Sequence, residues 1–296
     1  MRIAILSSGT AEVRSPFDRA LLQGLREQGW VEGRNLHVER RYGTSRLVDS
    51  ARELGAGNFD AILTTCTPST RMMMQHSSST PIVMAAVSDP VQQHIIASYA
   101  KPGGNVTGTA SQAEDLLAKR LEHVRALLPA VTAVAVLANP RNPAHALGWQ
   151  KLEREAPAMR FRVVRFEIND PDDAALAVEG AARAGAGALL VLSDDPLMLN
   201  ARPQIVAAAA KHRIPDFHWE RSFVEAGGLI SYGEDLRGTY RTAALYFDKI
   251  KKGARPALLP VEQPTRFELV INQKTATALG LTVPPAMLAR ADEVLN

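Results

Sequence analysis

The sequence has little of what builds disulfide-stabilised or membrane-spanning proteins. Its 296 residues include one cysteine, Cys66, so no intramolecular disulfide can form. Aromatic residues make up 5% of the chain, and no apolar run approaches the roughly 20 residues that span a bilayer. The first residues read as a strand and not as a secretory leader. The composition therefore indicates a globular chain of one or two domains.

The motifs of common cofactor and metal sites are also missing. The seven histidines form no HxxxH or HExxH pair, no GxGxxG follows the first apolar run, and Gly103 and Gly104 lack phosphate-loop spacing. The net charge is only +3, and the 34 Lys and Arg residues are spread along the chain, unlike the basic face of a nucleic-acid-binding protein. We therefore expect no cofactor, no metal and no nucleic-acid partner.

Short β-rich apolar runs alternate with helical stretches throughout the chain, which is typical of parallel sheets covered by helices. The first half predicts strands at residues 2–6, 36–40, 61–64 and 82–85, with helices at 16–28, 45–56, 68–76 and 90–98. After a turn cluster and a short β segment at 102–109, the second series predicts strands at 133–137, 162–166, 188–192 and 214–216, with helices at 144–156, 172–184, 197–211 and 221–226.

The last section, residues 229–279, is too small for a third domain and supplies further strands and helices to the first two. The predicted fold is α/β, with two doubly wound Rossmann-like lobes joined by three crossovers. We expect residues 1–107 plus 230–263 to form the N-terminal lobe and 108–229 plus 264–296 the C-terminal lobe, with a ligand cleft between them. Such connections favour hinge bending.

Polar residues follow the predicted strands, at the sheet edge where open α/β folds bind ligands. The candidate ligand-binding residues are Ser7, Ser8, Thr65, Thr67, Ser69, Ser88, Asp89, Asn139, Asp194, Asp195 and Trp219. For each Asp or Asn before a proline, ordinary helix capping is the alternative interpretation.

Residue type suggests how these groups would divide a zwitterionic ligand. Hydroxyls and helix N-terminal amides at Ser8, Thr67 and Ser69 suit a carboxylate, and Asp89, Asp194 or Asp195 suits an ammonium group. Trp219 fits stacking against a ligand or packing on the lobe surface. Cys66 lies in a strand-to-helix turn and is interpreted as a small buried residue.

Several longer motifs resemble the ABC transporter substrate-binding family that includes tryptophan/tyrosine-type importer binding proteins. They are SPF at residues 15–17, GLREQGWVEGRN at 24–35, SDPV at 88–91, KPGGNVTG at 101–108, EAGGLISYG at 225–233 and LPVEQPTRFELVIN at 259–272. The resemblance covers nearly the whole chain. It departs from the expected pattern at Cys66, where Gly or Ala is expected in many relatives.

The resemblance implies a type I periplasmic-binding-protein fold that captures a small polar ligand by interlobe closure. An aromatic or aliphatic amino acid is the expected ligand, with its carboxylate and amino groups held at the 67–69 and 88–89 turns. It further implies no catalytic residues, an ABC permease in the membrane as partner, a monomer, and a periplasmic or membrane-anchored extracytoplasmic location with the leader missing from this sequence.

Three alternatives stay open at this point. A cofactor-independent racemase or transferase would use Cys66 or paired carboxylates in the same cleft, and would need a second acid or base opposite the first. The effector domain of a transcription regulator shares the fold but needs a helix-turn-helix, for which there is no room before the first strand. Nucleosides and other small polar compounds are alternative ligands.

Overall fold

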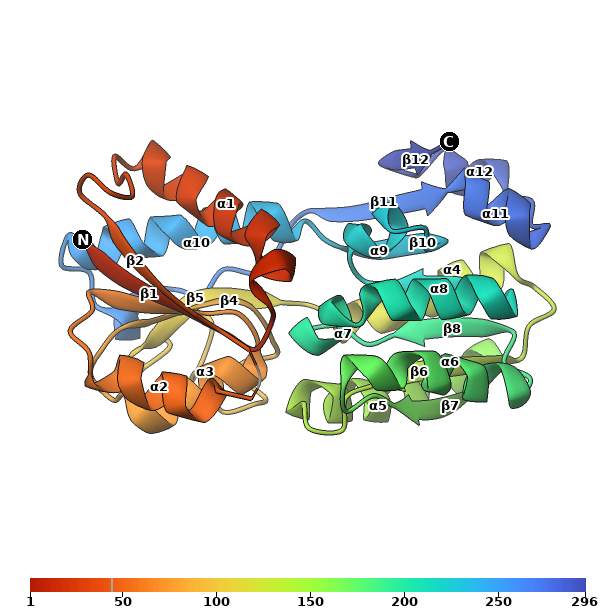
Figure 1. Ribbon diagram of the computed structural model, residues 1–296, viewed down its shortest axis with the longest axis horizontal. Coiled ribbons are helices and arrows are strands. Elements are labelled where there is room, and N and C mark those ends of the chain that lie inside the picture. The colour runs from red at the N-terminus through yellow and green to blue at the C-terminus, as the bar shows by residue number, and fades with distance from the viewer. Residues whose placement is uncertain (44) are drawn as a thin grey trace. The chain divides into compact units, whose positions relative to one another are not determined.

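The computed structural model describes residues 1–43 and 45–296, which fold into two compact units. Unit 1 comprises Met1–Gln112 and Asp235–Thr265, and unit 2 comprises Ala113–Glu234 and Arg266–Asn296. The chain thus passes from one unit to the other three times, and each unit is discontinuous in sequence (Figure 1). No helix among the described residues is long and apolar enough to cross a membrane.

Unit 1 is built on a parallel five-stranded sheet in the order β2-β1-β3-β4-β5. The strands are β1 (Arg2–Ser7), β2 (His37–Tyr42), β3 (Ala61–Thr64), β4 (Ile82–Ser88) and β5 (Val106–Ser111). β3 and β4 are buried along their whole length, as expected for inner strands covered on both faces. Their continuous apolar runs therefore predict this sheet well.

The main helices of unit 1 are α1 (Ala11–Glu27), α2 (Leu47–Ala56), α3 (Thr67–His76) and α10 (Leu236–Lys251). Although about 200 residues separate them, α1 and α10 lie side by side (Figure 1). Gly24 permits this close packing, because a Cβ there would lie 2.6 Å from the Arg241 carbonyl oxygen. The second segment of unit 1 is therefore part of its core layer.

Unit 2 holds a seven-stranded sheet in the order β12-β11-β10-β9-β8-β6-β7, parallel except for the β10–β11 pair. The strands are β6 (Ala133–Ala138), β7 (Arg162–Glu167), β8 (Ala188–Val191), β9 (Asp216–His218), β10 (Ile230–Glu234), β11 (Phe267–Asn272) and β12 (Glu293–Leu295). The helices are α4 (Asp115–Leu127), α5 (Pro143–Glu155), α6 (Ala174–Arg183), α7 (Pro196–Asn200), α8 (Arg202–His212), α9 (Arg221–Glu225), α11 (Gln273–Leu279) and α12 (Pro285–Leu288).

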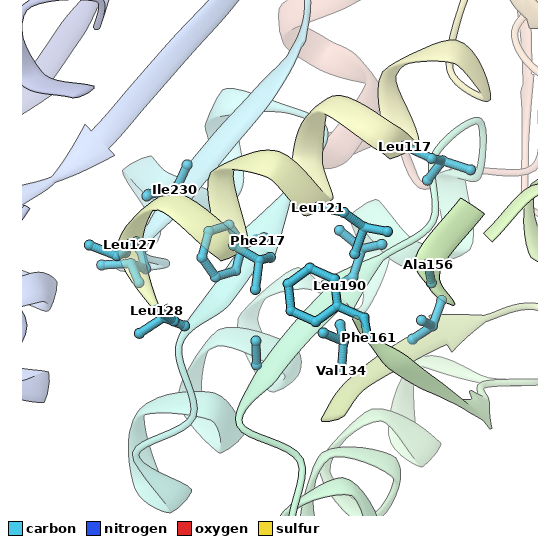
Figure 2. Packing of buried hydrophobic residues seen from close by; sticks show 14 of the residues in the cluster. Leu117, Leu121, Leu127, Leu128, Val134, Ala156, Phe161, Leu190, Phe217 and Ile230 are labelled. Carbon is cyan, nitrogen blue, oxygen red and sulfur yellow. The ribbon is translucent and has the colours of Figure 1, made fainter. Parts of the chain in front are cut away.

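The core of unit 2 forms where α4 packs on the sheet. Figure 2 shows Leu121 of α4 beside Leu190 of β8 and Phe217 of β9, all at most 1% exposed. Burying a side chain of this size contributes about 1.5–3 kcal/mol relative to leaving it in water. This packing fixes α4, which the sequence analysis did not predict.

Three predicted helices differ from the structure. The helix predicted at 16–28 begins at Ala11, because the Thr10 side chain caps it and Pro16 is accommodated inside it. The helix predicted at 197–211 is divided at Ala201 into α7 and α8. The helix predicted at 90–98 does not form: the segment consists of turns, and the positive φ of His94 (56°) is incompatible with a continuous helix.

The predicted lobe boundaries also need correction at two strands. The boundary at 107 and 108 would divide β5, which pairs with β4 inside unit 1. The boundary at 230 would assign β10 to unit 1, but β10 pairs with β9 and β11 in unit 2. Backbone hydrogen bonds between neighbouring strands determine the unit to which β5 and β10 belong. The hydrophobic pattern of the sequence does not reveal which strands pair.

A glycine in β5 provides a test of how closely the strands of unit 1 pack. Gly108 has φ +126°, and a Cβ there would lie 2.1 Å from the Met84 carbonyl oxygen. We expect Gly108→Ala to lower the free energy of unfolding by about 2–4 kcal/mol in urea denaturation. Gly104→Ala is the matched control, because nothing lies within 4 Å of its added Cβ. Equal stability of the two variants would contradict this packing.

Candidate functional site

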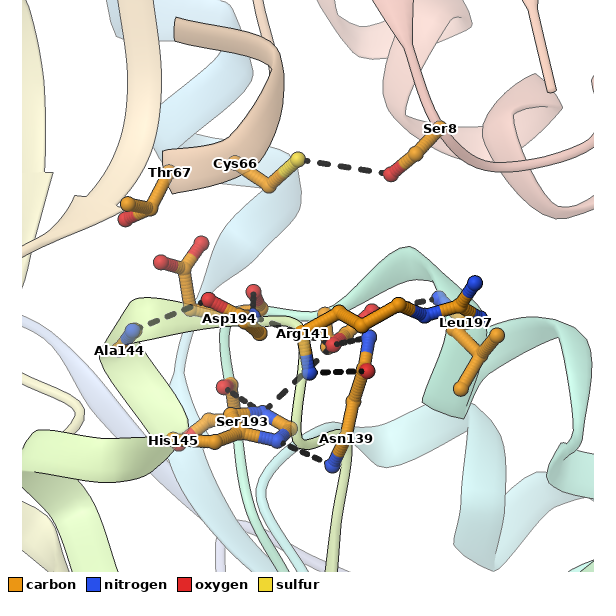
Figure 3. Close-up of polar contacts among 12 residues, drawn as sticks. Ser8, Cys66, Thr67, Asn139, Arg141, Ala144, His145, Ser193, Asp194 and Leu197 are labelled. Atoms are coloured by element: carbon orange, nitrogen blue, oxygen red, sulfur yellow. Dashed lines mark hydrogen bonds and ion pairs between the residues drawn. The ribbon is translucent and has the colours of Figure 1, made fainter. Parts of the chain in front are cut away.

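The carboxyl ends of β1, β3 and β4 are neighbours in unit 1, and polar residues follow each of them. Thr65 donates to the Ser7 hydroxyl at 2.8 Å, and the Ser69 hydroxyl accepts from the Thr65 amide at 3.1 Å. Ser8 contacts the Cys66 sulfur at 3.5 Å (Figure 3). The structure therefore brings four predicted site residues, Ser7, Ser8, Thr65 and Ser69, into one buried hydroxyl cluster around Cys66.

The β4 turn is joined to the start of α3 through Gln93. The Gln93 side-chain amide donates to the Thr67 hydroxyl at 3.1 Å and to the Ser88 carbonyl at 2.8 Å. Asp89 is half-buried, and its φ of 32° places it in the left-handed region. Strained backbone of this kind costs of order 1–3 kcal/mol and is concentrated at functional sites. Gln93 thus holds the turn at Ser88 and Asp89 against Thr67 at the start of α3.

Unit 2 has a corresponding network at the carboxyl ends of β6 and β8. Both oxygens of Asp195 are engaged: one accepts from the Leu197 amide at 2.8 Å, and the other from the Asn139 and Asn142 side chains at 2.8 and 3.1 Å. Asp195 thereby caps α7 and joins the two loops. Asp194 has φ 62° and directly follows Ser193, as Asp89 follows Ser88 in unit 1.

His145 of α5 holds this network together, although the sequence analysis did not single it out. Its Nδ1 accepts from the Asn139 amide at 2.8 Å, so the proton is on Nε2, which donates to the Ser193 carbonyl at 2.8 Å. Figure 3 shows the His145 ring in contact with the Asn139 backbone nitrogen and with Ser193. Burial lowers the pKa of His145, and this effect exceeds the opposing attraction to Asp195. The imidazole is therefore neutral at pH 7.

Two buried arginines were also missed, and no motif in the sequence marks them. Arg120 of α4 donates from Nε to the Tyr232 carbonyl at 2.9 Å and from Nη1 to the Ser193 hydroxyl at 3.3 Å. It thus connects the middle of β10 with the loop that follows β8. Burial lowers the pKa of Arg120 to about 10, while Glu234 and Glu114 favour its charged form. Arg120 is therefore still a cation at neutral pH.

Arg14 lies in α1, shortly after the Ser7 and Ser8 loop. Its guanidinium carbon is 4.6 Å from the centre of the Tyr240 ring and 5.0 Å from that of Phe17. Asp18 is 3.6 Å from Nη2, but Nε and Nη2 have no hydrogen-bond partner in the part of the chain that the structure describes. A buried cation with unused donors is costly unless a further group completes its hydrogen bonds.

Trp219 follows β9 in unit 2 and is 6% exposed. The centre of its ring lies 6.4 Å from the centre of the Phe223 ring, and the His218 ring stacks on the same Phe223 ring at 4.3 Å. The indole N–H is buried and makes no hydrogen bond within residues 1–43 and 45–296. Trp219 is therefore packed in its own unit, and its donor is available.

Apart from Trp219, which packs against Phe223, the predicted site residues form two polar groups, each at the carboxyl edge of one unit. Every one of them except Asp89 is buried. Across the described ranges, no group of three or more His, Cys, Asp or Glu side chains is arranged to hold a metal ion. Two α/β units with such edges define the type I periplasmic-binding-protein class.

The comparisons with known proteins specify the family. A family model described as ABC transporter substrate binding protein matches residues 10–295, so the chain belongs to this family. The chain is 24% identical over 266 residues to the tyrosine-binding protein of Clostridioides difficile (strain R20291), covering 89% of this chain and 76% of that protein. The resemblance inferred from the sequence motifs is confirmed.

Two solved structures cover 99% of this chain and 99% of their own. The ABC domain in complex with L-Trp from Streptococcus pneumoniae has a TM-score of 0.91 at 23% identity. A conserved domain protein from Vibrio cholerae O1 biovar El Tor strain N16961 has a TM-score of 0.92 at 28% identity. The predicted fold class is thereby confirmed, whereas the individual site residues stay predictions.

The protonation state of His145 can be measured directly. Because its folded pKa is below the unfolded value of about 6.5, the unfolded chain binds more protons just below that pH, and stability falls as the pH decreases through about 6.5. In a nitrogen-15 NMR titration we expect His145 to keep the signature of a neutral imidazole with a proton on Nε2 at pH 6. A ring that titrates like free histidine would contradict the network.

Proposed function

We propose that this substrate-binding protein captures an aromatic amino acid, with tyrosine and tryptophan as the first candidates. The observation that carries the proposal is the pair of polar carboxyl edges, one in each unit, that combine hydroxyls, carboxylates and unused buried donors. The relatives support the ligand class, since one is named for tyrosine and another was solved with L-Trp. Aliphatic amino acids and nucleosides are the comparison ligands.

The carboxylate of the ligand is assigned to unit 1. Arg14 offers two unused donor atoms, Nε and Nη2, and Ser8 adds a hydroxyl beside Cys66 at the start of α3. Ser69 is a weaker candidate than the sequence suggested, because its hydroxyl already donates to the Cys66 carbonyl. Charge-assisted hydrogen bonds from guanidinium to carboxylate are about twice as strong as neutral ones. A carboxylate at this position would relieve the cost of burying Arg14 with incomplete hydrogen bonding.

The ammonium group is assigned to Asp89 or Asp194, the two acidic residues that follow strands in the left-handed conformation. Asp195 is a weaker candidate than the sequence suggested, because three donors already occupy its oxygens. Trp219 is proposed to contact the aromatic ring, with its indole N–H available to a ligand oxygen. Asn139 is proposed to shape the pocket through its bond to Asp195.

Capture follows from contacts made by both units. A ligand that binds the two edges together favours a closed form, whereas one that contacts a single unit shifts no equilibrium between the forms. Membership of the family supports an ABC permease as partner and an extracytoplasmic location. We further propose that the protein acts as a monomer and performs no catalysis on its ligand, in contrast to the racemase and transferase alternatives.

Isothermal titration calorimetry against tyrosine, tryptophan, phenylalanine, leucine and uridine tests the proposal. We expect tight binding of at least one aromatic amino acid. Chiral chromatography should show that this amino acid keeps its configuration after prolonged incubation with the protein. Asp89→Asn preserves the acceptor for the Gln92 amide and tolerates the left-handed backbone, but removes the charge. It should weaken binding about tenfold or more.

The exposed Glu153, near the C-terminal end of α5, provides the control, because Glu153→Gln removes the same charge away from both carboxyl edges. This variant should bind as the wild type does. If none of the three aromatic amino acids binds, or if one of them is racemised or consumed, the proposed function is wrong.

Arg14 provides a second, independent test of the same site. Arg14→Met keeps an unbranched side chain between Phe17 and Tyr240 but removes the guanidinium donors. We expect the dissociation constant for the aromatic amino acid to rise at least about tenfold, with a smaller effect on the thermal stability of the free protein. Unchanged affinity would show that Arg14 has only a structural role.

A further inference from the structure

A cavity of about 190 Å³ lies in unit 2 between α4, β11 and α12. Its wall is largely apolar and includes Ala126, Leu269 and Met287. None of the polar residues at the carboxyl edges lines it. The cavity is therefore a separate feature from the proposed amino-acid site and lies within one unit.

A buried imidazole with unused hydrogen-bonding capacity lines this cavity. His123 of α4 is 6% exposed, and its ring lies 4.9 Å from the Tyr232 ring, which fixes its orientation. Its Nε2 is buried and has no hydrogen-bond partner among the described residues. Such an atom costs free energy in the empty protein, and a polar ligand group in the cavity would supply the missing bond.

The charged residues of the cavity leave one positive charge unpaired. Lys119 forms an ion pair with Glu122 on the same helix. Arg290 is exposed and also lines the cavity, and its side chain makes no hydrogen bond or ion pair within the ranges that the structure describes. A guanidinium fork without a partner, beside an unused imidazole nitrogen, matches the two oxygens of a single carboxylate.

We propose that this cavity is a second ligand site of the protein, which binds a small monocarboxylic acid with an apolar aliphatic or aromatic body. The carboxylate would pair with Arg290 and hydrogen-bond to His123, and the body would lie against Leu269 and Met287. The size is suitable, since an apolar protein cavity of about 150 Å³ is enough to hold benzene. The net charge of +1 from Lys119, Glu122 and Arg290 favours a monoanion over a more highly charged phosphate ester.

His123 also provides a spectroscopic reporter for this site. Burial together with Lys119 and Arg290 lowers the pKa of His123 to about 4, so the ring is neutral at pH 7 and carries one N–H and one lone pair. A bound anion opposes the effect of the two cations and raises this pKa. Binding should therefore change both the ring-nitrogen shifts at pH 7 and the titration of His123 at lower pH.

The test uses benzoate as the probe and the full-length protein saturated with its amino acid ligand, if one has been found. At pH 7 we expect saturable nitrogen-15 shifts of His123 on addition of benzoate, and a higher His123 pKa in its presence. Benzamide has the same body without the charge and should produce much smaller shifts. The absence of a saturable change up to about 10 mM benzoate would overturn the proposal.

Two variants separate the proposed contacts from general attraction of anions. Arg290→Gln should weaken benzoate binding about tenfold or more, and His123→Phe should weaken it while retaining a ring next to Tyr232. Arg154→Gln removes the same charge from an exposed position on α5 of the same unit and should have no effect. Equal losses in Arg290→Gln and Arg154→Gln would overturn the assignment.

The benzoate experiments can be distinguished from binding at the proposed amino-acid site. Arg290→Gln should leave binding of tyrosine or tryptophan unchanged, because the cavity that Arg290 lines includes none of the carboxyl-edge residues that are proposed to bind the amino acid. If benzoate instead competes with the amino acid and fails to shift His123, it binds at the carboxyl edge, and the second site does not exist.

Discussion

Parallel pairing of the strands is the constraint on which the rest of this structure depends. In unit 1, β1, β3 and β4 run in the same direction, and in unit 2 the same holds for β6, β8 and β9. Their carboxyl ends therefore come to one edge in each unit, and the loops that follow must share it. Buried apolar strands drive this arrangement, and polar chemistry at the edge is its consequence.

Sharing one edge makes the loops dependent on one another for hydrogen bonds. In unit 2, Asp195 and His145 satisfy the donors and acceptors of three segments and hold Asp194 in its left-handed conformation. In unit 1, Ser69 and Gln93 do the same for the turns after β3 and β4. Buried polar networks rigidify a site when they are complete. The incomplete positions, at Arg14 and Trp219, are where a ligand would contribute most.

Sequence patterns predicted the strands and loops that are determined by residues close together in the sequence. Continuous apolar runs located most of the strands, and small polar residues before prolines located the loops at the carboxyl edges. The 90–98 segment was mispredicted because its turns depend on left-handed residues such as His94, which composition does not reveal. The motif resemblance correctly indicated the family, although it could not identify the atoms that contact the ligand.

The missed residues share a different cause. Arg14, Arg120 and His145 lie on helices, and their partners are distant in sequence: Arg120 donates to Tyr232 and Ser193, and Arg14 packs against Tyr240. A single arginine in a helix is usually solvated, so nothing local distinguishes these from the others. Only tertiary packing shows that they are buried. The corrected position of β10 has the same origin, since strand pairing assigned it to unit 2.

The central proposal is that one aromatic amino acid binds both units and draws them together. Small-angle X-ray scattering with and without saturating tyrosine or tryptophan tests it most directly. We expect a smaller radius of gyration with the ligand that calorimetry shows to bind. At a lower concentration that half-saturates the wild type, the decrease should be smaller for Asp89→Asn than for the wild type. Tight binding with an unchanged scattering profile would contradict capture by closure.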